Sequence, residues 1–294
     1  MFELGHNKWF CTNLDKRVGI DVVKIKEPFS VKFNIKQKIQ DLSFQDAADF
    51  TAKCISAKYK NIYLSFSGGL DSEFVGSVLI RNKINFVPVI IKINNESEFW
   101  HASKFCTENK LEPIIYDFSN KAFEYFKLML TSCFILKKQW SVGYGSNIIM
   151  KLLNDPTANI LTGAGDPFRE SETFLEPMGD ILKISEHDFY LDYEYADQHP
   201  SSFFSYTPEI FRSAIQEIDT SLNSQIAKAK LYGLLPRGKT QHNLDALRYQ
   251  LIKSHPQHSE KFDKMLYFYN NDLINSSKYY FIEKDKLLEQ LEYK

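Results

Sequence analysis

Short apolar runs alternate with segments of helical periodicity through the middle of the chain. Residues 61–66 are rich in strand formers, and apolar side chains then recur at helical spacing at Leu70, Phe74 and Val78. Further strands are expected at 86–93, 113–116 and 158–162, and further helices at 96–109, 120–136 and 147–153. Strands that are apolar throughout are typical of sheets covered on both faces. The pattern predicts an α/β fold with a doubly wound parallel sheet.

The first 42 residues show a different pattern. Apolar or alternating runs at 8–11, 18–25 and 29–35 predict two or three short strands, so residues 1–42 are expected to form a small N-terminal β element. Ser43 then provides an N-cap for a helix that ends near Tyr59. This helix begins the predicted α/β domain, residues 43–200.

The last third of the chain is predicted to be largely helical. Residues 173–195 alternate around a Pro-Met-Gly-Asp turn, which predicts a β-hairpin. From Thr207, with Pro208 at a helix start, the periodicity predicts a C-terminal helical region within residues 201–294. The expected helices cover 208–218, 222–232, 241–254, 258–268 and 281–291.

Composition narrows the classes of function only slightly. The net charge of −1 gives no overall support for a nucleic-acid or membrane surface, although nucleic acid is not excluded. The four cysteines are isolated, which indicates neither a zinc site nor a redox pair. No signal peptide opens the chain and no apolar run approaches the length of a membrane span. We therefore expect a cytoplasmic protein with no membrane partner.

The turn after the first strand carries the clearest chemistry. It reads Ser67-Gly68-Gly69-Leu70-Asp71-Ser72 and leads directly into a helix. Two glycines allow close approach of an oxygen-rich ligand, and the helix start supplies N–H donors and partial positive charge. The Asp71 carboxylate can hold Mg²⁺ against phosphate oxygens. No Lys follows the glycines, so a Walker loop is disfavoured.

This Ser-Gly-Gly-x-Asp-Ser sequence resembles the pyrophosphate loop of the N-type ATP pyrophosphatases. The resemblance implies the adenine nucleotide alpha hydrolase-like (HUP-type) version of the α/β fold, and ATP with Mg²⁺ as cofactors. It also implies cleavage of ATP between the α and β phosphates. The implied ATP-binding residues are Phe66, Ser67, Gly68, Gly69, Asp71 and Ser72.

A second turn, Leu161 to Asp166, narrows the resemblance to the synthetase domain of asparagine synthetases. In that group a Thr-Gly-Glu-Gly-x-Asp loop contacts AMP and pyrophosphate, which implies nucleotide contacts for Gly163 and Gly165. Asp166 would share the metal with Asp71. This sequence departs from the family pattern at two positions. Ala164 replaces the glutamate that acts as a general base in the amide-forming step, and Asp166 comes one position earlier than the family's Asp. Taken alone, the pattern also suits a plain turn at a strand end.

Two lysines are further candidates. Arg237-Gly238-Lys239 resembles an Arg-x-Lys that places a lysine over the α-phosphate in the same group, so Lys239, with Asp71, is the catalytic candidate. The alternative is a basic surface turn. Lys92, at the end of the second strand, could reach the triphosphate, and Ile91 beside it would offer backbone groups to adenine.

These features predict an ATP-dependent adenylylating enzyme. The expected partners are a small-molecule acceptor with a carboxylate or carbonyl, and ammonia or an amine as nucleophile. Phe2 stands where a glutaminase would need its N-terminal Cys, so the chain is not expected to make its own ammonia. Two alternatives stay open. One is a tRNA- or nucleobase-modifying enzyme. The other is an inactive nucleotide-binding module, which is consistent with Ala164 in place of the family's Glu.

Overall fold

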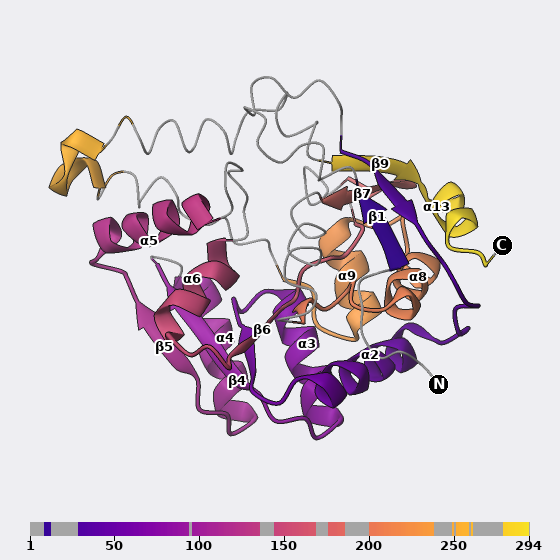
Figure 1. The fold of residues 1–294 in the computed structure, drawn as a ribbon, viewed down its shortest axis with the longest axis horizontal. Coiled ribbons are helices and arrows are strands. Elements are labelled where there is room, and N and C mark those ends of the chain that lie inside the picture. Colours follow the sequence, from indigo (N-terminus) through magenta and orange to yellow (C-terminus); the bar gives the residue numbers. More distant parts are fainter. Residues whose placement is uncertain are drawn as a thin grey trace.

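The largest sheet among the described residues has five parallel strands, of which β4, β5 and β6 are labelled in Figure 1. The computed structural model describes residues 9–12, 29–93, 96–135, 144–168, 176–185, 200–237, 249, 251–258, 260 and 279–293. The strand order is β5–β4–β3–β6–β8. The strands are β3 (Ile62–Ser65), β4 (Val87–Lys92), β5 (Ile114–Asp117), β6 (Asn159–Thr162) and β8 (Ser201–Ser202). The predicted α/β fold with a parallel sheet is confirmed.

The chain winds outward from β3 in both directions. Helix α3 (Leu70–Arg81) leads from β3 to β4, and α4 (Glu96–Glu108) leads on to β5. Helices α5 (Ala122–Ile135) and α6 (Tyr144–Leu153) then return the chain to β6, on the other side of β3. The winding therefore reverses between β3 and β6. Ligands of such sheets bind at the carboxyl ends of the strands at this reversal, where both glycine loops lie.

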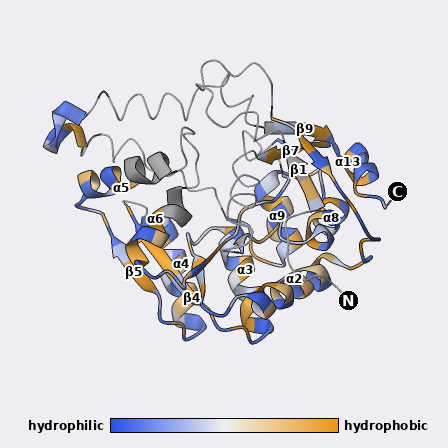
Figure 2. Ribbon diagram, viewed as in Figure 1, coloured by the Kyte–Doolittle hydropathy of each residue, from blue (hydrophilic) through white to orange (hydrophobic). Residues whose placement is uncertain are grey.

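Both faces of the sheet are covered, which explains the apolar strands. Leu64, Ile90 and Leu161 belong to the largest buried cluster on one face. Their neighbours Val89 and Ile160 belong to a second cluster, to which α6 contributes. Alternate residues of a strand point to opposite faces, so each strand serves two cores. Figure 2 shows the hydrophobic colouring of β4 and β5 against the mixed colouring of α2.

Three further predicted helices are confirmed, and each has a capping residue. Helix α2 (Phe44–Lys58) begins after Ser43, whose hydroxyl accepts a bond from the Asp46 N–H. Helix α8 (Pro208–Glu217) has Thr207 as its N-cap and proline in the first turn. Helix α9 (Ser224–Tyr232) begins after Asn223 and ends at Gly233, in the left-handed conformation. These caps satisfy donors and acceptors that a helix end leaves open.

The N-terminal strands pack on the C-terminal helices. Strands β1 (Phe10–Thr12) and β2 (Val31–Phe33) pair antiparallel, as predicted, while residues 18–25 lie outside the described part. The Trp9 indole donates to the Ser205 carbonyl over 3.2 Å, and its ring centroid lies 5.2 Å from that of Phe211. Described residues of all three predicted segments share one core cluster. The division at residues 42 and 200 stays a prediction.

The strand β9 and the start of the last helix differ from the prediction. Strand β7 (Ile181–Ser185) pairs antiparallel with β9 (Tyr279–Glu283), about a hundred residues away. Most of the predicted hairpin at 173–195 lies outside the described residues, so it stays a prediction. The terminal helix α13 (Lys284–Gln290) begins at residue 284, not 281. Phe281 is exposed and Ile282 is buried, an alternation that suits a strand with one covered face. Figure 1 shows β7, β9 and α13 on the far side of the molecule from β5.

The remaining predicted helices fall largely outside the described residues. Of 241–254, residues 249 and 251–254 are described and helical. Of 258–268, only 258 and 260 are described, and His258 closes a 3-10 turn, Pro256–His258. No helix in the described ranges has the length and hydrophobicity needed to cross a membrane.

Candidate functional site

The loop between β3 and α3 leaves the start of α3 open. Gly69 is the N-cap residue, and among the described residues no side chain caps this helix end. The Gly69 N–H donates to Ser67 Oγ over 3.2 Å, and Ser72 Oγ lies 3.3 Å from Ser67 Oγ. The first N–H groups of a helix have no intrahelical acceptor and attract anions. Two hydroxyls and a helix N-terminus therefore meet at one place, an arrangement suited to phosphate.

The two glycines of this loop face different surroundings. Gly68 has φ +84°, and a Cβ there would lie 2.2 Å from the Glu98 carbonyl oxygen in α4. Its missing side chain thus lets the loop pack on α4. At Gly69, a Cβ would meet only Ser67 Oγ within 4 Å. Gly69 therefore has open space beside it, and the ligand contacts that the sequence predicts for both glycines stay predictions.

The second glycine loop packs directly on the first. A Cβ at Gly163 would lie 2.8 Å from the backbone nitrogen of Ser72, at the start of α3. Gly165 has φ +94°, and a Cβ there would lie 2.5 Å from Ser205 Oγ. The Phe204 N–H also donates to the Ala164 carbonyl over 3.1 Å. These glycines serve loop packing, which brings Asp71 and Asp166 to the same side of the sheet; their nucleotide contacts stay a prediction.

Helix α9 contributes two site residues that the sequence analysis missed. The ammonium of Lys228 lies 3.2 Å from Asp71 Oδ1 and 3.3 Å from Asp71 Oδ2, and it also contacts Asp166 Oδ2. The Tyr232 hydroxyl donates to Asp71 Oδ1 over 2.7 Å. Residues four apart lie on one face of a helix, so Lys228 and Tyr232 reach the same carboxylate. The four-residue spacing of Lys228 and Tyr232 is the only feature of the sequence that places them together, and neither residue belongs to a recognisable motif.

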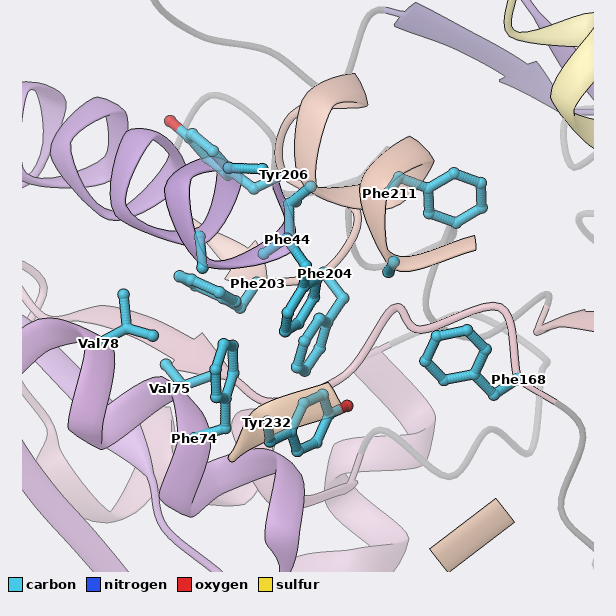
Figure 3. Close-up of a cluster of buried hydrophobic side chains, with 14 of the residues drawn as sticks. Phe44, Phe74, Val75, Val78, Phe168, Phe203, Phe204, Tyr206, Phe211 and Tyr232 are labelled. Carbon is cyan, nitrogen blue, oxygen red and sulfur yellow. The ribbon is translucent and has the colours of Figure 1, made fainter. Parts of the chain in front are cut away.

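An aromatic stack holds the Tyr232 ring in place. The rings of Phe44, Phe74, Phe204 and Tyr232 lie nearly parallel, with interplanar angles from 5° to 21°. The Phe74 and Tyr232 centroids are 4.6 Å apart. Figure 3 shows these rings meeting from α2, α3, α9 and the segment after β8, with the tyrosine oxygen at the edge of the stack. The core thus positions a polar group of the site.

Burial keeps the Tyr232 hydroxyl protonated. Loss of solvation raises its pKa well above the usual value, and the negative charges of Asp71 and Asp166 raise it further. The hydroxyl is therefore a hydrogen-bond donor and not a base at neutral pH. Its acceptor Asp71 is about one-third exposed, while Lys228 is nearly covered at 8%.

Arg237 contacts both the first glycine loop and helix α3. Its Nη1 donates to the Gly68 carbonyl over 2.9 Å and its Nη2 to Glu73 Oε2 over 2.5 Å. The Arg237 and Glu73 side chains are each 18% exposed, so this arginine packs on the first loop, while Leu235 in the same segment is exposed. The pKa of nearby His101 is lowered, chiefly by burial and then by Arg237, which favours the neutral imidazole. Lys239 lies outside the described residues.

The other predicted contacts are less well placed for a ligand. The Phe66 side chain is buried, 5.0 Å from the Phe105 ring, so any ligand contact would come from its backbone. Ile91 packs against the core within β4. Lys92 pairs with Glu96 over 3.1 Å and lies 4.7 Å from the Phe99 ring centroid. Nucleotide contacts of Phe66 and Ile91 stay predictions.

The predicted metal ligands Asp71 and Asp166 do come together, but around an ammonium. Mg²⁺ binds carboxylate oxygens at about 2.0–2.1 Å, and Lys228 already contacts the same oxygens. Within the described ranges, no group of three or more His, Cys, Asp or Glu side chains is arranged to hold a metal. With Lys228 in this position, the two carboxylates do not fit a shared divalent ion.

No family model and no curated protein matches this chain. Solved structures give weak likenesses. An NH3-dependent NAD synthetase from Campylobacter jejuni is 16% identical, with a TM-score of 0.34, over 79% of this chain and 93% of that one. An NMN synthetase from Francisella tularensis is 12% identical, with a TM-score of 0.34, over 74% and 96%. A predicted tRNA methyltransferase subunit from Methanocaldococcus jannaschii is 14% identical, with a TM-score of 0.31, over 62% and 93%.

Proposed function

We propose that the protein is an ATP-dependent adenylylating enzyme, which converts ATP to AMP and pyrophosphate. One observation supports this most: the open start of α3, with Ser67 and Ser72, lies beside the buried Lys228 where the sheet reverses. Helix amides, hydroxyls and a fixed ammonium together suit a polyphosphate.

In this proposal the β and γ phosphates bind at Ser67, Gly68, Gly69 and Ser72. Gly163 and Gly165 lie next to AMP, and the backbone near Ile91 contacts adenine. Lys239 stabilises charge on the α-phosphate, the role that its resemblance implies. Asp71 orients Lys228 and Tyr232 beside the phosphates, and any Mg²⁺ would come with the triphosphate.

The chemistry has two steps. A carboxylate or carbonyl oxygen of the acceptor attacks the α-phosphorus, forming an O–P bond as the bond to the bridging oxygen breaks. Pyrophosphate leaves with the electron pair. An amine or ammonia nitrogen then attacks the activated carbon, the C–O bond to AMP breaks, and the nitrogen loses a proton to solvent or a base. This amide-forming step corresponds to the asparagine synthetase resemblance.

For the second step we assign no general base among the described residues. Ala164 replaces the carboxylate that would accept the proton. Tyr232 stays protonated, since its pKa is raised by burial and by the neighbouring carboxylates. Positioning and charge stabilisation would therefore supply much of the rate.

Product identity tests the proposal. Purified protein would be incubated with α-³²P-ATP and Mg²⁺, with and without a small-molecule extract, and AMP would be separated from ADP. We expect AMP that depends on the extract and is lost in Asp71→Asn. Asp285→Asn, an exposed aspartate on α13, is the matched control and should behave as wild type. ADP as the product would contradict the proposal.

Two further results separate the alternatives. Tight ATP binding without turnover in any extract would favour the inactive nucleotide-binding module. AMP formation that requires added tRNA, and not small molecules, would favour the base-modifying enzyme. Lys239→Met should lower turnover by about 10²–10³-fold with little change in ATP affinity, as expected for a group that acts on the transition state.

A further inference from the structure

We propose that Lys228, and not a divalent metal, is the resident cation between Asp71 and Asp166. The two carboxylates come from different segments, one from the first turn of α3 and the other from the loop after β6, and the lysine comes from α9. The role of this cation in ATP binding rests on the proposed function. The arrangement itself can be tested without any nucleotide.

Three oxygens of the two carboxylates already have a hydroxyl or ammonium partner. Asp71 Oδ1 accepts from the Tyr232 hydroxyl at 2.7 Å and lies 3.2 Å from the Lys228 ammonium. Asp71 Oδ2 lies 3.3 Å from the same ammonium, which also contacts Asp166 Oδ2. A divalent ion on these oxygens would lie next to a positive charge and would have to displace it.

The lysine has little freedom to move aside. Its side chain is 8% exposed, and its ammonium lies 6.0 Å from the Phe168 ring centroid. The flanking residues Ala227 and Ala229 are buried, and Tyr232, one turn further along α9, is fixed in the aromatic stack. Removing a buried ammonium from its two carboxylates leaves charges without partners, which is costly. The helix therefore holds the cation in place.

A fixed ammonium here would do two things that a shared metal would otherwise do. It joins the two glycine loops through their carboxylates, and it places positive charge close to the open start of α3. A preorganised cation can stabilise developing negative charge without reorganising when the ligand binds. We therefore assign Lys228 as a positioning residue that replaces the metal bridge between the loops.

Manganese binding without nucleotide tests this assignment directly. Free Mn²⁺ would be followed by electron paramagnetic resonance as protein is added. We expect no saturable binding to wild type. Lys228→Met keeps the length and apolar stem of the side chain but removes the charge, so this variant should gain saturable Mn²⁺ binding. Adding Asp166→Asn to Lys228→Met should abolish the gained binding.

Two control variants test whether Mn²⁺ binding depends specifically on removing the charge at position 228. Lys230→Met removes an exposed lysine on the same helix and should bind no Mn²⁺, and Lys228→Arg keeps a cation and should also bind none. Circular dichroism would confirm that each variant is folded. Wild-type binding of Mn²⁺ that Asp71→Asn or Asp166→Asn removes would overturn the proposal. A folded Lys228→Met variant that gains no site would overturn it as well. If Lys228→Met does not fold, the wild-type measurement still decides.

Discussion

The Tyr232 hydroxyl donates a 2.7 Å hydrogen bond to Asp71, a residue 161 positions earlier in the chain. This bond connects the aromatic core with the candidate site, because the Tyr232 ring belongs to the stack with Phe44, Phe74 and Phe204. Core packing therefore decides where a polar group of the site lies.

Tyr232→Phe separates these two roles. The ring stays in the stack, while Asp71 loses one donor. We expect a loss of about 1.5 kcal/mol in the free energy of unfolding, measured in urea, because the acceptor is charged but partly exposed. ATP affinity should fall as Asp71 and Lys228 shift. Tyr293→Phe, at an exposed position, is the control. An unchanged stability and affinity would show that the bond matters for neither.

Two glycine substitutions separate loop packing from ligand space. Gly163→Ala places a Cβ 2.8 Å from the α3 backbone, so we expect a loss of about 1–3 kcal/mol in unfolding free energy. Gly69→Ala meets only Ser67 Oγ within 4 Å and should cost less than about 1 kcal/mol, yet it should weaken ATP binding more than stability suggests. Calorimetric titration with ATP measures the affinity, and unfolding in urea measures the stability. Equal ATP affinity in Gly69→Ala would count against a phosphate at this helix start.

Arg237→Lys tests the contact with the first loop. A lysine keeps the charge but cannot reach the Gly68 carbonyl and Glu73 together as the guanidinium does. We expect ATP affinity to fall about tenfold, equivalent to about 1.4 kcal/mol, by equilibrium dialysis. Arg212→Lys, whose partner is the exposed Asp41, should change nothing. Wild-type affinity in Arg237→Lys would make this contact dispensable for ligand binding.

Thiol reactivity tests the packing of α2 and α4. Burial raises the pKa of the Cys54 and Cys106 thiols to about 11 from about 9. Both should resist iodoacetamide in the folded protein at pH 8 and react fast after unfolding, as measured by mass spectrometry of peptides. The unfolded thiols ionise first as pH rises, so their contribution to stability should decline between about pH 9 and 11. Rapid labelling of either cysteine in the folded state would contradict this packing.

The sequence predicts those parts of the fold that local signals determine. Helix α2 has Ser43 as a cap and an apolar face, and β4 is apolar throughout, so both were found near their observed bounds. Pairing between β7 and β9 escaped prediction because alternation shows which face is buried but not which strand is the partner. The two-residue strand β8 is too short to leave a pattern.

The candidate site, like the fold, could be predicted only where the sequence carries a local signal. The first glycine loop has a compact motif, and the structure places it at the reversal of the sheet, where a ligand is expected. Lys228 belongs to no motif, since one lysine in a helix resembles any solvated residue until tertiary contacts bury it. Its position between Asp71 and Asp166 depends on three segments that meet only in the folded chain.

Pyrophosphate exchange tests directly whether the protein adenylylates an acceptor. Protein, ATP and ³²P-labelled pyrophosphate would be incubated with the extract fraction that supports AMP formation, and labelled ATP would be counted. We expect label in ATP only when the acceptor is present, and we expect this label to be lost in Asp71→Asn but not in Asp285→Asn. An active fraction that yields AMP without any exchange would contradict a reversible adenylate intermediate, and with it the proposed reaction.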